Sequence, residues 1–320
     1  MQIKRPDNLI LRYKATALLI SIFRAIFLIT MSFVIVYPIL YMISLSIRDV
    51  KDLYDVTVIW VPKNFTAENY KAVIEAMDYL PMLIKTIIST TISTFLNVAI
   101  CAITGYGFAR QNFKGRGLLF GLVILTIIVP PQTISIPMFM QYYAFDFLGL
   151  GLIGELFIGQ PFSINLLNTS FTFYIPAILG MGLRSGLFIY IFRQFFRGMP
   201  EELEDASYID GCNTFMTFIR IMLPNAGPAI LTSTMFSFVW YWNDYYLSTL
   251  YFDEPSTLSV SLARLESALS SAGNAANVDP FAVFLKLQAG CVLLILPLVI
   301  AFIFLQSKFT ESIDKTGIVG

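Results

Sequence analysis

Residues 201–224 read EELEDASYIDGCNTFMTFIRIMLP, a charged stretch in a chain that is otherwise strongly apolar. Five carboxylates crowd into its first ten residues, and a single Gly211 follows them. Pro200 suits the first position of a helix, where the helix dipole also favours acids. Gly211 permits a sharp change of direction, and Asn213-Thr214 can cap a second helix that Pro224 ends. The pattern therefore predicts two short helices joined at a glycine.

Each predicted helix of this hairpin has one distinct face. On the first helix that face is Leu203, Ala206, Ser207 and Asp210, and on the second it is Phe215, Phe218, Ile219 and Met222. Composition alone leaves two interpretations open, an amphipathic connector on lipid headgroups or a docking surface for a protein. Five carboxylates are poorly matched to an anionic cytosolic leaflet, which favours the protein partner.

The composition indicates an integral membrane protein. Of 320 residues, 57% are hydrophobic and only 13% are charged, against about a quarter charged in soluble domains. Basic and acidic residues are equal in number, so the chain has no net positive charge that would attract nucleic acid. The chain has no histidine, and its three cysteines are far apart, so neither a metal site nor a catalytic centre is expected.

Six stretches are long and apolar enough to cross a membrane as helices of about 20 residues. Pro130-Pro131 predicts a break inside the third stretch, and Pro38 a kink in the first. Small polar residues in the second stretch, including Asn97, favour close helix packing over ligand binding. We expect a single transmembrane domain over 1–320 with spans at 17–46, 82–108, 117–142, 173–196, 226–251 and 286–307, and a cytosolic hairpin at 199–224 between the fourth and fifth.

Basic residues set the expected orientation, because loops rich in lysine and arginine stay in the cytosol. Six spans place four basic segments on one side of the membrane. These are the N-terminus (Lys4, Arg5, Arg12, Lys14), the loop after the second span (Arg110, Lys114, Arg116), the hairpin (Arg193, Arg197, Arg220) and the tail (Lys308, Lys315). We therefore expect both termini and the hairpin in the cytosol of a bacterial-type cell.

The spacing of the hairpin resembles the cytoplasmic loop motif of ABC importer permeases. That motif is Glu-Ala-Ala, three residues, Gly, nine residues, Ile, one residue, Leu-Pro. It reads here as Asp205-Ala206-Ser207, Gly211, Ile221 and Leu223-Pro224, with Asp and Ser in place of Glu and Ala. Further segments resemble the carbohydrate uptake branch, in particular the second permease of maltose-type importers: Trp60–Thr66, Asn69-Tyr70, Gly105–Arg110, Val129–Gln132, Ile136-Pro137, Trp242–Asp244 and Lys315–Gly320.

The resemblance implies a subunit that forms half of a translocation pathway. Its expected partners are a second permease, a dimer of ATPase subunits, an external solute-binding protein, membrane lipid and a sugar. The hairpin would be the coupling helix, with docking residues Glu204, Asp205, Ala206, Ser207, Asp210, Gly211, Ile221, Leu223 and Pro224. The chain has no phosphate-binding G-x-x-x-x-G-K-[ST] loop, so ATP and magnesium are expected on the partner ATPase and no cofactor on this chain.

The segment Trp240, Trp242, Asn243, Asp244 and Tyr245 combines aromatic faces with polar groups, as sugar sites do. Two interpretations stay open here, a lining of the substrate pathway or an aromatic belt and packing. At the level of function, a permease for a non-sugar solute and a stand-alone secondary transporter are the alternatives. The second would show two related halves with acids at the membrane midplane, and neither is evident.

Overall fold

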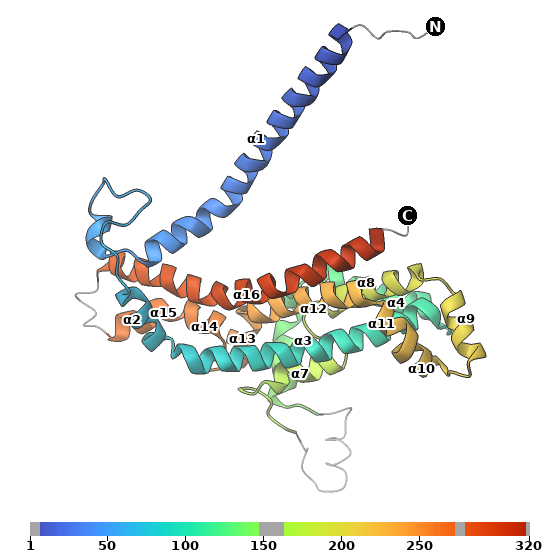
Figure 1. Ribbon diagram of the computed structural model, residues 1–320. Coiled ribbons are helices and arrows are strands. Elements are labelled where there is room, and N and C mark those ends of the chain that lie inside the picture. Colours follow the sequence, from blue (N-terminus) through green and yellow to red (C-terminus); the bar gives the residue numbers. More distant parts are fainter. Residues whose placement is uncertain (1–6, 147–162, 273–278, 318–320) are drawn as a thin grey trace. The chain divides into compact units, whose positions relative to one another are not determined.

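The computed structural model describes residues 7–146, 163–272 and 279–317, and its regular structure in these ranges is helical (Figure 1). Two isolated bridges, Arg48 with Phe65 and Phe145 with Ile164, are the only strand-like pairings there. The predicted all-α class is confirmed for this part of the chain. Lys4 and Arg5, used above for orientation, and residues 318–320 of the glycine-rich ending lie outside the described residues.

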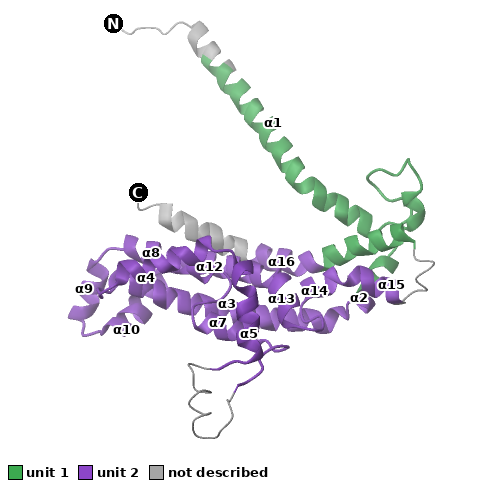
Figure 2. Ribbon diagram, turned by 180° about the vertical axis from the view of Figure 1, so that it is seen from behind, with its two compact units in different colours: residues 1–73, 273–293 green, residues 74–272, 294–320 purple. Residues whose placement is uncertain are grey.

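The chain forms two compact units, residues 1–73 with 273–293 and residues 74–272 with 294–320 (Figure 2). The first unit contains α1 (Asp7–Ser46), η1 (Val50–Leu53), most of α2 (Glu68–Ala76) and the start of α16 (Pro280–Gly317). The second contains the rest of α16 and α3 (Tyr79–Arg110), α4 (Arg116–Ile128), η2 (Pro131–Ile134), α5 (Ser135–Tyr143), α7 (Phe171–Ile178), α8 (Ser185–Gly198), α9 (Glu202–Ile209), α10 (Thr214–Thr217), η3 (Phe218–Met222), α11 (Leu223–Asn225), α12 (Gly227–Trp242), α13 (Tyr246–Tyr251), α14 (Leu258–Ala263) and α15 (Leu265–Ala272).

Three single helices among the described residues are long and apolar enough to cross a membrane. They are Thr16–Ser46 within α1, Tyr79–Arg110 and Pro280–Phe304 within α16. These match the first, second and sixth predicted spans, and α1 continues through Pro38 without interruption. The third predicted span is a bent pair, in which Arg116–Ile128 and Pro131–Tyr143 meet at 101°. The break falls at Pro130-Pro131, as expected from proline's missing N–H.

The fourth and fifth predicted spans each occur as two shorter helices. Between α7 and α8 the backbone turns at Gly180, whose φ of +72° only glycine adopts freely. Between α12 and α13 it turns at Asn243-Asp244, where the Asp244 carboxylate accepts the backbone N–H of Ser248 at 2.8 Å. Apolar composition alone did not reveal these breaks, because apolar residues continue on both sides of each.

The core of the second unit is the contact between α3 and α8, and it depends on Gly105. A Cβ at this position would lie 2.5 Å from Phe192 Cβ and 3.0 Å from the backbone nitrogen of Arg193. Glycine therefore allows the two backbones to approach closely, which is how helices associate where lipid gives no hydrophobic drive. Large apolar side chains fill the space around the contact, among them Tyr106, Phe188, Phe196 and Met222.

A polar cluster lies within this core around Asn97. The Asn97 amide donates to the Leu183 carbonyl at 3.1 Å, and its oxygen accepts the Ser185 hydroxyl at 2.6 Å. Five small polar residues of the second predicted span are buried: Thr86, Thr90, Ser93, Thr94 and Asn97. The interpretation of this face as a packing face is confirmed.

We predict that Gly105→Ala destabilises the subunit, because the added methyl group overlaps Phe192 and overpacking costs about 1–3 kcal/mol. Gly107→Ala is the matched control, since a Cβ there meets no atom within 4 Å. Alanine is also the better helix former by about 1 kcal/mol. Thermal unfolding of the purified importer should therefore shift down for Gly105→Ala and stay level or rise for Gly107→Ala. Equal shifts of the same sign would contradict the packing argument.

Candidate functional site: a helix–glycine–helix hairpin

The charged stretch folds as the predicted pair of short helices, at one end of the second unit (Figure 1). Two backbone hydrogen bonds end α9. The Cys212 N–H donates to the Ser207 carbonyl and the Gly211 N–H donates to the Tyr208 carbonyl, each at 3.0 Å. This arrangement requires a left-handed residue after the helix, and Gly211 supplies it with a φ of +82°. Asn213 then caps α10, accepting the Met216 N–H at 2.8 Å.

Both predicted proline boundaries are wrong in detail. The first helix begins at Glu202, two residues after Pro200. The second does not end at Pro224, because the helical backbone continues to Asn225. A π-helical turn, Phe218–Met222, precedes the proline, and a widened turn removes the clash that proline causes in a regular helix. The Asn225 amide donates to the Ile221 carbonyl at 2.7 Å.

Glu204 points into the protein and forms a clasp, which we define as Glu204, Tyr106 and Arg110. Its carboxylate accepts the Tyr106 hydroxyl at 2.6 Å and forms an ion pair with Arg110, with Nε and Oε2 3.2 Å apart. Arg110 also donates to the Met199 carbonyl and lies 3.5 Å from the exposed Glu201 carboxylate. Glu204 is only 8% exposed. The clasp thus joins the end of α3 to the hairpin.

A second contact holds the two arms of the hairpin to each other. The hydroxyl groups of Ser207 and Thr217 lie 2.7 Å apart, and both residues are fully buried. Phe218 and Met222 also turn inward, and the Phe218 ring lies 5.0 Å from that of Tyr106. The predicted apolar face of the second arm is therefore divided, since Phe215 and Ile219 on it are exposed.

The outward surface of the hairpin combines acids with apolar side chains. Asp205, Ala206 and Asp210 are exposed, and so is Ile209, at 85%. The exposed apolar and aromatic side chains there also include Leu203, Tyr208, Phe215, Met216, Ile219 and Pro224. Glu201, Glu202, Asn213, Thr214 and Arg220 are exposed polar side chains of the same hairpin. Ile221 and Leu223 are half-buried. Of the three carboxylates expected to face a partner, Asp205 and Asp210 face outward and Glu204 does not.

The aromatic segment after the hairpin is divided between packing and a cavity. Trp242 is fully buried and donates its ring N–H to the Leu294 carbonyl at 3.2 Å. Asp244 caps α13, and the Asn243 amide donates to Val239 one turn back at 3.0 Å. Tyr245 is exposed. For Trp242, Asn243 and Asp244 these contacts are structural. Trp240 lines a cavity.

That cavity has a volume of about 270 Å³ and lies within the second unit. The Arg184 guanidinium is 5.6 Å from the centre of the Trp240 ring and lines the same space. Three tyrosines, Tyr142, Tyr241 and Tyr251, and two threonines, Thr126 and Thr172, also line it. Sequence reasoning did not single out these three tyrosines and two threonines. They come from five separate segments, and no local spacing connects them.

Comparisons with known proteins agree with this architecture. Residues 98–315, which include the whole hairpin, match the family of binding-protein-dependent transport system inner membrane components. The arabinooligosaccharides transport system permease protein AraQ of Halalkalibacterium halodurans is 30% identical over 90% of this chain and 93% of its own length. The AraQ protein of Bacillus subtilis is 28% identical over 81% of each chain.

A solved structure shares the fold. It is a bacterial ABC transporter involved in the import of the acidic polysaccharide alginate, and the match has a TM-score of 0.65 at 18% identity. It covers 97% of this chain and 100% of the matched chain.

The helical fold, the hairpin and these matches define a membrane-spanning transport subunit. The chain belongs to the family of inner membrane components of binding-protein-dependent transport systems, and it is an ABC importer permease subunit. The resemblance read from the hairpin motif is confirmed. A stand-alone secondary transporter is not supported.

We predict that the two carboxylates beside Arg110 differ sharply in their contribution to stability. Glu204→Ala leaves a buried guanidinium without its close partner, which should cost about 3 kcal/mol or more. Glu201→Ala removes a carboxylate that is 86% exposed, and should change stability by less than about 0.5 kcal/mol. Thermal unfolding of the two purified variants measures the difference. Indistinguishable midpoints would contradict the clasp.

Proposed function

We propose that the chain is the permease subunit of an ATP-driven importer for a sugar or oligosaccharide, and that the hairpin couples it to a separate ATPase. The observation that carries this proposal is the outward surface of the hairpin. An acidic and apolar face on a rigid, internally clasped element suits a partner groove that offers a basic residue and apolar contacts. In this proposal hydrolysis takes place on the partner, with ATP and magnesium bound there.

The roles within the hairpin follow from its geometry. Asp205 and Asp210 offer charge to the ATPase, and Ala206, Ile209 and Phe215 offer apolar contact. Gly211 sets the angle between the arms, and Ser207 holds them together. Glu204 acts from inside, by fixing the hairpin to α3. Ile221, Leu223 and Pro224 keep the second arm continuous with α12.

The remaining assembly is also part of this proposal. Residues 1–320 act as one permease domain that crosses the membrane six times, and three of the spans are broken helices. Both termini and the hairpin face the cytosol, by the distribution of basic loops. A second permease completes the pathway, and an external solute-binding protein delivers the substrate.

The proposed substrate class rests on relatives and on the cavity. Two relatives are named for arabinooligosaccharide transport. The cavity beside Trp240 offers an aromatic face and several hydroxyl groups, the combination on which sugars stack and hydrogen-bond. A non-sugar solute is the alternative. Uptake by the complete importer from a panel of arabino-, gluco- and galacto-oligosaccharides and polar non-sugar solutes decides between them.

We predict that Asp205→Lys and Gly211→Pro abolish uptake and stimulated ATPase activity without loss of membrane insertion. Lysine reverses the charge offered to the partner, and proline cannot adopt a φ of +82°. Gly211→Asn is the matched control, because asparagine tolerates the left-handed region, and should retain most of the transport. Normal transport by Asp205→Lys together with tight ATPase binding would refute the docking role.

We predict that Trp240→Ala lowers substrate uptake several-fold, since stacking on an aromatic face contributes about 1 kcal/mol or more. Trp240→Phe preserves a ring at the cavity and should retain most of the uptake. The basal ATPase rate of the assembled complex, measured in parallel, should be the same for both variants. Unaltered uptake by Trp240→Ala would remove this cavity from the pathway.

A further inference from the structure

The loop that follows α1 folds back along that helix. The Trp60 ring lies 4.7 Å from the Tyr37 ring and 6.4 Å from the Phe33 ring, measured between centroids. The Ser44 hydroxyl donates to the Trp60 carbonyl. These contacts hold the loop beside the helix. All of these residues belong to the first unit.

The position of Trp60 along α1 gives its depth. The membrane-spanning part of α1, Thr16–Ser46, has 31 residues and is roughly 46 Å long. A hydrocarbon core of about 30 Å leaves roughly 16 Å of helix outside it. Tyr37 and Phe33 precede Ser46 by nine and thirteen residues, or roughly 14 and 20 Å. Even if the whole of the roughly 16 Å of helix outside the hydrocarbon lay at the Ser46 end, the hydrocarbon boundary would fall between Tyr37 and Phe33. Trp60, which contacts both rings, would then reach that boundary.

Part of the backbone of the loop is hydrogen-bonded within the first unit. Three successive carbonyls are capped, since Arg48 donates to Val58 and Ile59 at 3.4 and 2.8 Å, and Ser44 donates to Trp60. The N–H of Thr57 binds the Asp55 carboxylate at 2.9 Å. An irregular segment beside lipid requires such bonds, because little water is available there to replace them.

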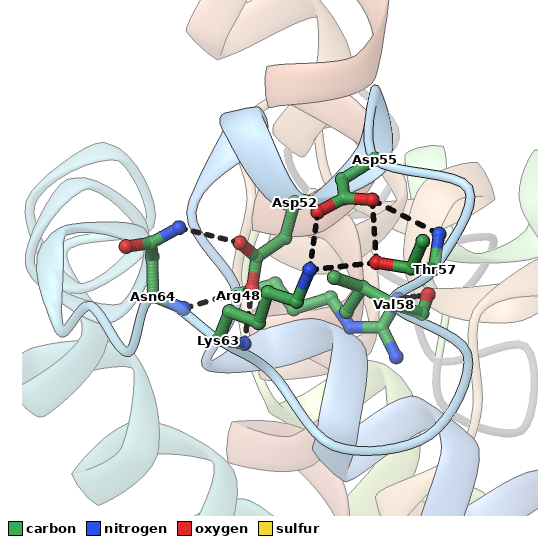
Figure 3. A network of polar contacts seen from close by, with 7 residues as sticks. All are labelled: Arg48, Asp52, Asp55, Thr57, Val58, Lys63 and Asn64. Atoms are coloured by element: carbon green, nitrogen blue, oxygen red, sulfur yellow. Dashed lines mark hydrogen bonds and ion pairs between the residues drawn. The ribbon is translucent and has the colours of Figure 1, made fainter.

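The charged side chains of the same loop form a network of polar contacts (Figure 3). Buried Asp52 accepts the backbone N–H groups of Lys63 and Asn64 at 2.8 and 3.0 Å. Burial alone would raise the pKa of Asp52, but these bonds and the Asn64 amide lower it, so the carboxylate stays ionised. Asp55 and Lys63 form an ion pair at 2.6 Å.

The side chains that point away from this network are apolar. Val56 is 92% exposed and Val61 is 71% exposed, and Ile59 is also largely exposed. Exposed aliphatic groups beside a tryptophan and two tyrosines, Tyr37 and Tyr41, form the pattern of a membrane-interface belt.

We propose that the loop 54–62 is inserted into the lipid leaflet at the Ser46 end of α1, with Val56, Ile59 and Val61 among the acyl chains and Trp60 at the headgroup boundary. The occupant of this apolar surface is lipid. The depth set by Trp60, the capped carbonyls and the outward aliphatic groups each favour it. The loop thereby anchors the end of α1, a role distinct from ATPase coupling and from the substrate pathway.

Site-directed spin labelling of the assembled importer in phosphatidylethanolamine–phosphatidylglycerol nanodiscs tests this. Single cysteines replace Val56, Ile59 or Val61 in a chain where Cys212 and Cys291 are alanine, while the fully buried Cys101 stays. Lys51→Cys and Glu68→Cys, exposed positions of the same unit, are the matched controls. Each labelled complex is first shown to transport.

The expected result is that labels at 56, 59 and 61 collide more with oxygen than with a water-soluble nickel chelate. Labels at 51 and 68 should show the reverse. Greater collision with the nickel chelate at 56 and 61 would overturn the proposal, because the loop would then lie in water. Low collision with both reagents would also overturn it, because a protein, such as the binding protein or the second permease, would then cover the surface.

Discussion

The close approach of α3 and α8 at Gly105 is the constraint on which the second unit depends. Lipid tails and the surfaces of these helices are both apolar, so burial of apolar side chains gives no hydrophobic driving force for helix association. The helices associate because glycine removes the side chain at the point of contact and lets the backbones pack. Once α3 is fixed against α8, its middle and its C-terminal end acquire definite neighbours. Asn97 meets Ser185 within the core, and Arg110 meets the hairpin.

The hairpin is rigid for reasons that lie mostly outside its own sequence. Its elbow is local, because a left-handed glycine and an asparagine cap define the turn between the arms. Its attachment is not local, because Glu204 reaches residues about a hundred positions earlier in the chain. A buried ion pair of this kind adds little net stability but penalises any arrangement that separates the charges. A movement of the hairpin would therefore be transmitted to α3.

Sequence reasoning recovered the existence of the hairpin, its glycine elbow, its cap and the proline break after α4. It placed six apolar segments, and each coincides with helix in the described residues. It failed on the continuity of two of them, because apolar residues continue on both sides of the breaks at Gly180 and Asp244. It also failed on Pro224, because the π-helical turn that accommodates this proline has no recognisable sequence pattern.

The sequence by itself determined the class of the protein, since composition requires a membrane and the spacing from Asp205 to Pro224 defines the family motif. It also predicted docking residues on the hairpin. Only the tertiary structure decided which way each of them faces. Neighbouring carboxylates such as Glu204 and Asp205 have the same chemistry, and a helix places them about 100° apart, so one meets Arg110 and the other meets solvent. Which of the two carboxylates is buried depends on the side chains that α3 offers, Tyr106 and Arg110, and these lie about a hundred residues earlier in the chain.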